Sequence, residues 1–251
     1  HGLIVLLGIF IGPNASGIYA LAIKFIDIPR KLIGYGFSSW AMGKFHAVKD
    51  DYTVLLGVYK TAYLWSSMVL VPCYFGLIAV SDSLVSTFMG EEWKDVPSIL
   101  SWLALFNCIM SLYILLPPLQ VLFKTTYNTL PVSLASTATL LLFVIFGAQY
   151  FGLYAPIIGI FVSLLIIIPK FSSELSKILK IPFLSLLKLI AGFFIAGFLM
   201  LIAIELIKLK LQVDNLYLLV LSGVLVYSIS VLCLTYFKAV NVDILKSIRS
   251  I

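Results

Sequence analysis

Long apolar segments alternate along the chain with short polar ones, and this alternation predicts the fold class. A membrane-spanning helix needs about 20 mostly apolar residues. Eight segments reach or approach that length: residues 1–11, 17–43, 54–80, 96–123, 130–149, 153–169, 183–207 and 215–237. The composition agrees, because 62% of the residues are hydrophobic and 11% are charged, against about 25% charged in an ordinary soluble domain. We predict an all-α, polytopic transmembrane helix bundle of about eight helices, in one membrane domain.

The first apolar segment is short, and the chain opens on it without an initiator Met. We therefore expect the sequence to be a piece of a longer protein, with the missing part on the N-terminal side.

The basic residues between the apolar segments predict the orientation, because cytoplasmic loops are enriched in Lys and Arg. One set of alternating loops and flanks holds three basic residues, Lys94, Lys208 and Lys210, beside several acidic ones. The other set holds eleven and is expected in the cytoplasm together with the C-terminus: Lys44, Lys49, Lys60, Lys124, Lys170, Lys177, Lys180, Lys188, Lys238, Lys246 and Arg249. This distribution explains the net charge of +6 without a nucleic-acid partner.

One predicted span carries four charges, Lys24, Asp27, Arg30 and Lys31, inside apolar residues 18–40. An ionisable side chain in hydrocarbon costs at least about 2.5 kcal/mol, so such a cluster is a functional-site hypothesis. Asp27 falls about 15 Å from the outer end of the helix, near mid-depth. At 100° per residue the cluster shares a polar or small line with Gly17, Ala20, Tyr35, Ser38 and Met42; the opposite side carries Ile18, Ala22, Phe25, Ile26, Leu32, Ile33 and Trp40.

Two interpretations of this cluster stay open. Asp27 can pair with Lys24 or Lys31 along the helix, and Pro29 is expected to bend the helix there. Because the cluster keeps a surplus of two positive charges, it can line a hydrated cavity that takes an anion such as a phosphate. Alternatively, Asp27 and Lys31 form a structural pair, while Lys24 and Arg30 extend toward an interface.

The remaining signals add little chemistry. Residues 171–187 are predicted to form a basic amphipathic segment on the inner membrane surface or a solvated loop. Trp93, in the acidic turn after residue 90, suits the outer interface. Cys73, Cys108 and Cys233 are isolated, and His46 is the one histidine inside the chain, so we expect no metal site, disulfide, cofactor or catalytic constellation.

Two segments carry a resemblance to a known family. Residues 12–22, GPNASGIYALA, are similar to the pattern G-x-x-x-x-G-x-Y-x-x-A, and residues 84–93, LVSTFMGEEW, followed by Ile99, Leu100, Leu103 and Ala104, resemble an outer-loop pattern. Both patterns are found in the polysaccharide flippases of the multidrug/oligosaccharidyl-lipid/polysaccharide exporter superfamily. The resemblance implies about fourteen helices, of which these are the seventh to fourteenth. Residues 1–182 would be the second six-helix lobe with its amphipathic cytoplasmic segment, and residues 183–251 the C-terminal helix pair and tail.

The resemblance also implies a function. The family's central cationic cavity would include Lys24, Arg30 and Lys31. The expected activity is export of a polyprenyl-diphosphate-linked oligosaccharide across the cytoplasmic (inner) membrane by alternating access, without covalent chemistry. The expected partners are this substrate, membrane lipid and the missing N-terminal lobe. A related drug/cation antiporter or a peptidoglycan-precursor flippase is the alternative within transport. A polytopic membrane enzyme of polysaccharide assembly is the alternative from another class.

Overall fold

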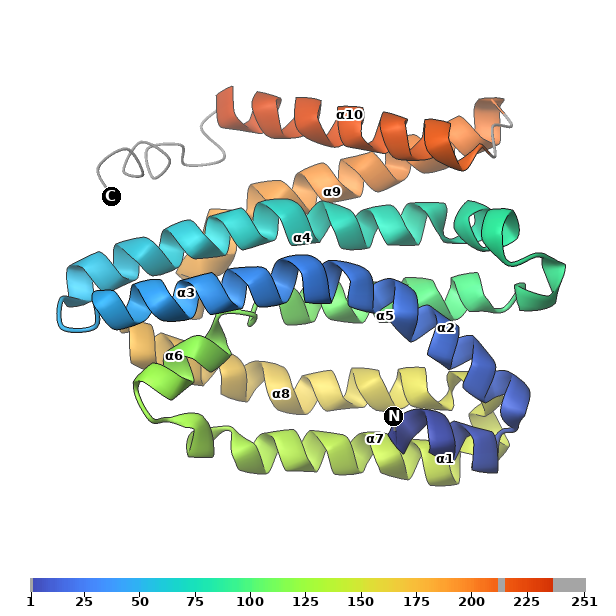
Figure 1. The fold of residues 1–251 in the computed structure, drawn as a ribbon, viewed down its shortest axis with the longest axis horizontal. Helices are drawn as coiled ribbons and strands as arrows, with labels where there is room; N and C mark the ends of the chain where they lie inside the picture. The colour runs from blue at the N-terminus through green and yellow to red at the C-terminus, as the bar shows by residue number, and fades with distance from the viewer. Residues whose placement is uncertain (1, 212–214, 237–251) are drawn as a thin grey trace.

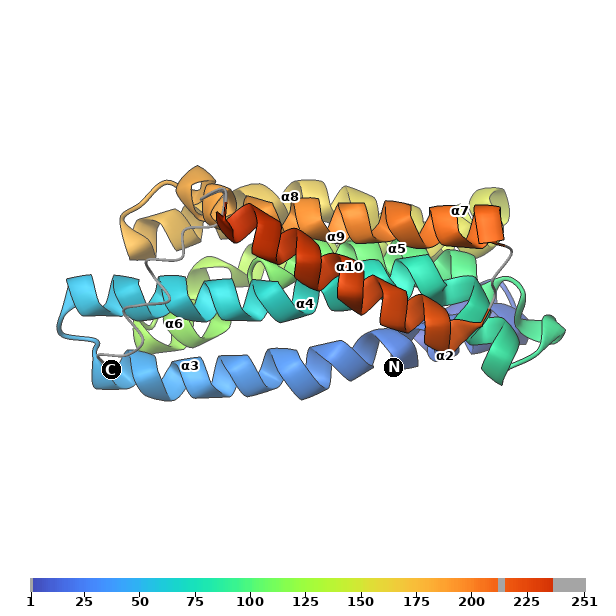
Figure 2. The ribbon, with the colours of Figure 1, turned by 90° about the horizontal axis from the view of Figure 1, so that it is seen from above.

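The computed structural model describes residues 2–211 and 215–236, and all regular structure in this part of the chain is helical. The helices run side by side along the long axis of one bundle, with α10 crossing obliquely (Figures 1 and 2). Their bounds are α1 Gly2–Phe10, α2 Pro13–Pro29, η1 Arg30–Gly34, α3 Tyr35–Ala47, α4 Tyr52–Phe88, η2 Glu91–Trp93, α5 Val96–Ser111, α6 Leu116–Leu122, η3 Thr126–Asn128, α7 Leu130–Phe151, η4 Gly152–Tyr154, α8 Ala155–Leu179, α9 Phe183–Leu211 and α10 Leu216–Tyr236.

Five stretches of the described chain are long and apolar enough to cross a membrane: Tyr52–Phe88, Val96–Leu122, Leu130–Leu179, Phe183–Lys210 and Leu216–Leu234. The third contains two helices, α7 and α8, joined by the turn Gly152–Tyr154. The all-α expectation is confirmed, whereas the expected count of eight spans is matched only in part. α1 has nine residues, too few to cross a bilayer, and residues 17–43 fall outside the five stretches because four charges interrupt them.

The loops gather at the two ends of the bundle as the charge distribution requires. The connections at residues 48–51, 123–129 and 180–182, in the basic set, lie at one end (Figure 1). The connection at residues 89–95 and the turn Gly152–Tyr154 lie at the other. In the acidic turn, the Trp93 ring lies 3.5 Å from the place that a Cβ on Gly17 would occupy, so this turn packs on α2. The basic residues beyond 236 are outside the described part of the chain.

The basic amphipathic segment at residues 171–187 does not form a separate surface helix. Its first nine residues continue α8 to Leu179, and α9 starts at Phe183. Leu175 and Leu179 are fully buried in the bundle, and the Leu179 carbonyl accepts a hydrogen bond from the Tyr52 hydroxyl. The apolar face that predicted contact with lipid therefore packs on the protein's own core.

Helices α7 and α8 pack so closely that Gly159 has no room for a side chain. A Cβ there would lie 2.8 Å from the Phe143 Cβ and 3.3 Å from the Leu140 Cα. Neither atom can rotate away, so a side chain must push the helices apart.

We expect Gly159→Ala to lower the free energy of unfolding by about 1–3 kcal/mol, because overpacking forces backbone shifts. The thermal unfolding midpoint of the purified protein in detergent measures this. Gly57→Ala on α4 is the matched control, since no atom lies within 4 Å of its added Cβ, and alanine is the better helix former by about 1 kcal/mol. Equal shifts for the two variants would contradict the close packing at Gly159.

Candidate functional site: a charged cluster on α2 and η1

The apolar face of α2 holds the charged residues in place. Ile18, Ala22 and Ile26 are at most 3% exposed and belong to a core shared with α4 and α5. The buried Tyr19 hydroxyl donates a hydrogen bond of 2.8 Å to the Leu153 carbonyl in η4. With this face fixed, the residues on the other side of α2 are fixed as well.

Pro29 changes the helix at the cluster. Proline has no N–H to donate to the carbonyl four residues earlier, and residues Arg30–Gly34 widen into one π turn, in which the Tyr35 N–H bonds the Arg30 carbonyl. Such turns insert one residue and occur frequently at functional sites. The bend expected at Pro29 is present, since the ribbon changes direction between α2 and α3 (Figure 1).

The inserted residue shifts the faces of the helix, and the predicted helical wheel is wrong beyond Lys31. Buried positions continue at Gly34, Ala41 and Phe45 after the turn. Leu32 is 76% and Trp40 47% exposed, although both were placed on the same face as Ile18 and Ile26. Tyr35 is also exposed. The polar line drawn at 100° per residue therefore does not run unbroken from Gly17 to Met42.

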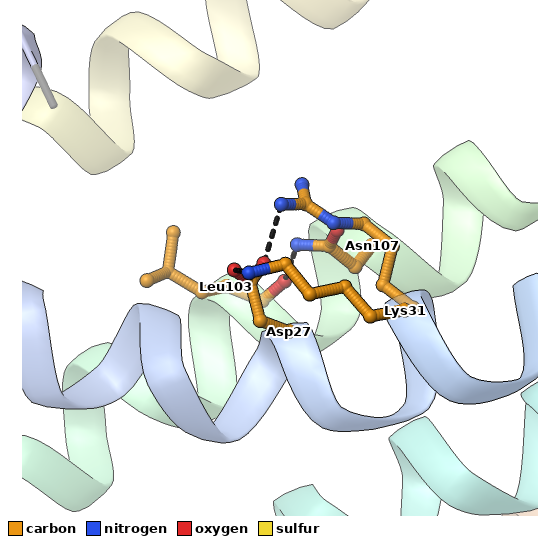
Figure 3. A network of polar contacts seen from close by, with 5 residues as sticks. Asp27, Lys31, Leu103 and Asn107 are labelled. Carbon is orange, nitrogen blue, oxygen red and sulfur yellow. Dashed lines mark hydrogen bonds and ion pairs between the residues drawn. The ribbon is translucent and has the colours of Figure 1, made fainter. Parts of the chain in front are cut away.

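Three of the four predicted site residues form one ion-paired group (Figure 3). Asp27 pairs with the Arg30 guanidinium through Oδ1 and with Lys31 through Oδ2, the latter at 2.7 Å from Nζ. The Asp27 side chain is 17% exposed, against 42% for Arg30 and 58% for Lys31. Lys24 is exposed, and no ion pair joins it to another residue within the described part of the chain.

Asn107 of α5 lies alongside the cluster (Figure 3), with its amide donating to the Leu103 carbonyl at 2.8 Å. Tyr74 of α4, 2% exposed, belongs to the same core as Ile26 of α2. Sequence reasoning missed both residues; the signal for Asn107 was an amide within an apolar span. The Arg30 Nε is buried and has no hydrogen-bond partner among the described residues, so this guanidinium retains donor capacity.

The opposite side of α2 borders an apolar cavity that sequence reasoning did not anticipate. The cavity has a volume of about 650 Å³ and lies between α2, α4, α9 and α10. Phe25 and Pro29, which line it, are about 160° around the helix from Asp27 at 100° per residue. A second cavity of about 560 Å³ between α3 and α4 is lined in part by Trp40 and Trp65, and Leu32, Ile33 and Val69 line both cavities. None of the four charged residues lines either cavity.

A helix with a half-exposed cationic face and an apolar cavity behind it can hold an anionic group and an apolar chain on its two sides. Together with the long apolar helices, this arrangement defines a multi-pass membrane protein with a charged cluster on one of its helices.

Residues 1–98 match the sequence profile of the family described as polysaccharide biosynthesis protein, and the matched part includes all four charged residues. The family resemblance seen in the sequence is thereby confirmed. Over 105 residues the chain is 30% identical to the teichuronic acid biosynthesis protein TuaB of Bacillus subtilis (strain 168). The alignment covers 42% of this chain and 22% of TuaB, so the chain spans less than a quarter of that relative in the match. No solved structure matches the chain.

Proposed function

We propose that this chain is part of a flippase that moves polyprenyl-diphosphate-linked oligosaccharide from the inner to the outer leaflet of the cytoplasmic membrane. Transfer occurs by alternating access and involves no covalent chemistry. The family match of residues 1–98 supports the link to polysaccharide assembly. The observation that carries the proposal is the cationic cluster at Asp27, Arg30 and Lys31, with Lys24 nearby.

The exposure of the cluster supports an anion site over a purely structural pair. A single carboxylate, Asp27, accompanies two cations whose side chains are 42% and 58% exposed, so neither is enclosed in a dry seam of the described bundle. Charges uncovered at this depth require water, another part of the protein or an anionic ligand. A diphosphate suits this site, because guanidinium and ammonium groups form short, charge-assisted hydrogen bonds with phosphate oxygens.

The two faces of α2 suit the two parts of the substrate. The diphosphate and any acidic sugar follow the charged face, while the apolar cavity on the other side of the helix gives the polyprenyl chain a surface away from water. Burial of apolar area stabilises such a contact by roughly 25 cal/mol per Å². In this proposal the helix separates the polar and apolar parts of one lipid.

The proposed architecture follows the same family resemblance. Residues 1–182 form the second six-helix lobe, with the amphipathic stretch now within α8 and α9, and residues 183–251 form the C-terminal helix pair and tail. The C-terminus is cytoplasmic, and the partner that faces the charged cluster is the N-terminal lobe of the same protein. Alternating access then consists of the two lobes tilting about a site between them.

A reconstituted transport assay tests this function. The complete protein is placed in proteoliposomes that carry a polyprenyl-diphosphate-linked oligosaccharide in one leaflet, and a membrane-impermeant lectin reports its arrival in the other. We expect transfer well above that of protein-free liposomes, with the mass of the glycolipid unchanged. Transfer of an organic cation such as ethidium in place of the glycolipid would overturn the proposal in favour of a drug/cation antiporter. A glycolipid of altered mass would instead indicate an enzyme.

A further inference from the structure

Helix α4 runs without interruption through a proline that deprives it of one hydrogen bond. Pro72 lies inside Tyr52–Phe88, and its ring nitrogen cannot donate to the carbonyl of residue 68. In a membrane helix a carbonyl freed in this way must find another donor, commonly on a neighbouring helix. The question at Met68 is therefore which group replaces the missing N–H.

The replacement donor is the hydroxyl of Tyr227 on α10. It bonds the Met68 carbonyl at 2.9 Å, across 159 positions of sequence. Tyr227 is 8% exposed, and a buried tyrosine hydroxyl needs a hydrogen-bond partner. The Met68 carbonyl is that partner. The described helices contain two more internal prolines, Pro29 and Pro169. At Pro29 the helix widens into a π turn. Among the described residues, no side chain donates a hydrogen bond to the carbonyl four residues before either of these prolines.

This hydrogen bond lies in the wall of the apolar cavity. The cavity is lined by Met68, Pro72 and Cys73 of α4 and by Tyr227 of α10. The hydrogen bond therefore joins two helices that form its wall. On the α9 side, the Lys208 ammonium donates to the Ala79 carbonyl of α4. If α10 moves away from α4, the cavity widens and the hydrogen bond from Tyr227 breaks. The Met68 carbonyl then has no donor, because Pro72 has no N–H to offer it.

We propose that the Tyr227 hydroxyl is a conformational latch. Its hydrogen bond keeps α4 straight at Pro72 and keeps α10 packed against α4. When the bond breaks, α4 bends at Pro72 and the apolar cavity opens. Proline is the usual site of sharp helix bending. The latch goes beyond the proposed transport function, since it depends only on the contact between α4 and α10, whatever molecule enters the cavity.

Cys73, next to Pro72 and in the cavity wall, provides a native reporter. The complete protein in nanodiscs is treated with N-ethylmaleimide, and modification of the Cys73 peptide is followed by mass spectrometry. Cys233 on α10 is exposed and serves as an internal reference. We expect Tyr227→Phe to raise the rate at Cys73 about 3–10-fold, as expected when one buried hydrogen bond no longer opposes opening. Tyr217→Phe, the same change at a 75% exposed position of α10, should have no effect.

A second substitution tests whether the effect depends on Pro72. In a Pro72→Ala background, residue 72 regains an N–H that can donate to the Met68 carbonyl, so Tyr227→Phe should no longer raise the rate. An unchanged rate after Tyr227→Phe, or the same rise with and without Pro72, would overturn the latch. If Tyr227→Phe does not fold, Pro72→Ala alone decides, because the latch requires it to slow modification of Cys73. Activity in the transport assay does not enter this test, so it can fail or succeed independently of the flippase proposal.

Discussion

Replacing Arg30 and Lys31 together by glutamine should lower the rate of glycolipid transfer by about 100-fold. A hydrogen bond to a charged group contributes about 1.5–3 kcal/mol, and each 1.4 kcal/mol corresponds to tenfold. Two such donors acting on one diphosphate therefore account for a loss of this order, allowing for their incomplete additivity. The measurement is the initial rate of transfer in the proteoliposome assay. Lys44→Gln with Lys49→Gln, the same chemical change near the end of α3, should leave the rate close to that of the unmodified protein.

A third substitution separates the anion site from a structural ion pair. After Arg30→Gln and Lys31→Gln, Asp27 is left without its two partners, and an unpaired carboxylate is itself harmful. Adding Asp27→Asn makes the group neutral, which a purely structural cluster tolerates because both partners of each pair are gone. Under the flippase proposal the triple variant stays impaired, since the diphosphate still has no cations to bind. Recovery of transport in the triple variant would remove the charged cluster from the mechanism.

The hydrophobic pattern predicted the helices because it depends on composition and length alone. The predicted span at residues 183–207 lies within α9, and the one at residues 54–80 lies within α4. The predicted break between residues 149 and 153 is also present, as the turn Gly152–Tyr154. The pattern could not show what the apolar face of residues 171–187 contacts. Amphipathicity states that a face avoids water, and both lipid and the protein core satisfy that requirement.

The sequence predicted that the charged side chains of the candidate site lie close together, but not the helix geometry around them. The spacing of Asp27 and Lys31 correctly indicated that they could pair, and Pro29 indicated a bend. The π turn packs against a residue 80 places away in the sequence, a contact that spacing does not contain: a Cβ on Gly34 would lie 2.5 Å from the Ile114 Cδ1. A helical wheel assumes a constant rotation per residue and cannot represent this.

The sequence indicated neither the apolar cavity nor the donor that reaches the Met68 carbonyl. Each is formed by residues of separate helices, and every contributor is an ordinary membrane residue when considered alone. Pro72 marked a carbonyl in need of a donor, yet the donor is on α10. Only the packing of α10 on α4 identifies which of the tyrosines on α10 supplies it.

Reversing the charge at Asp27 should have the largest effect on the folded protein itself. Asp27→Lys removes the shared partner of Arg30 and Lys31 and adds a further cation to the cluster. Losing one partner of a buried pair costs about 3–5 kcal/mol, and exposed pairs contribute less than about 1 kcal/mol. Because Asp27 is 17% exposed and its partners about half, we expect the free energy of unfolding to fall by about 2–3 kcal/mol. The thermal unfolding midpoint in detergent measures the loss.

Two matched variants identify the cause. Asp27→Glu keeps the negative charge and should remain near the stability of the unmodified protein. Asp27→Lys combined with Lys31→Asp restores an oppositely charged pair four residues apart and should recover part of the loss, which a mere packing defect at residue 27 would not allow. If Asp27→Lys is as stable as Asp27→Glu, the two cations are fully satisfied by water or lipid headgroups. The Asp27 carboxylate and its ion pairs would then contribute nothing to the free energy of unfolding.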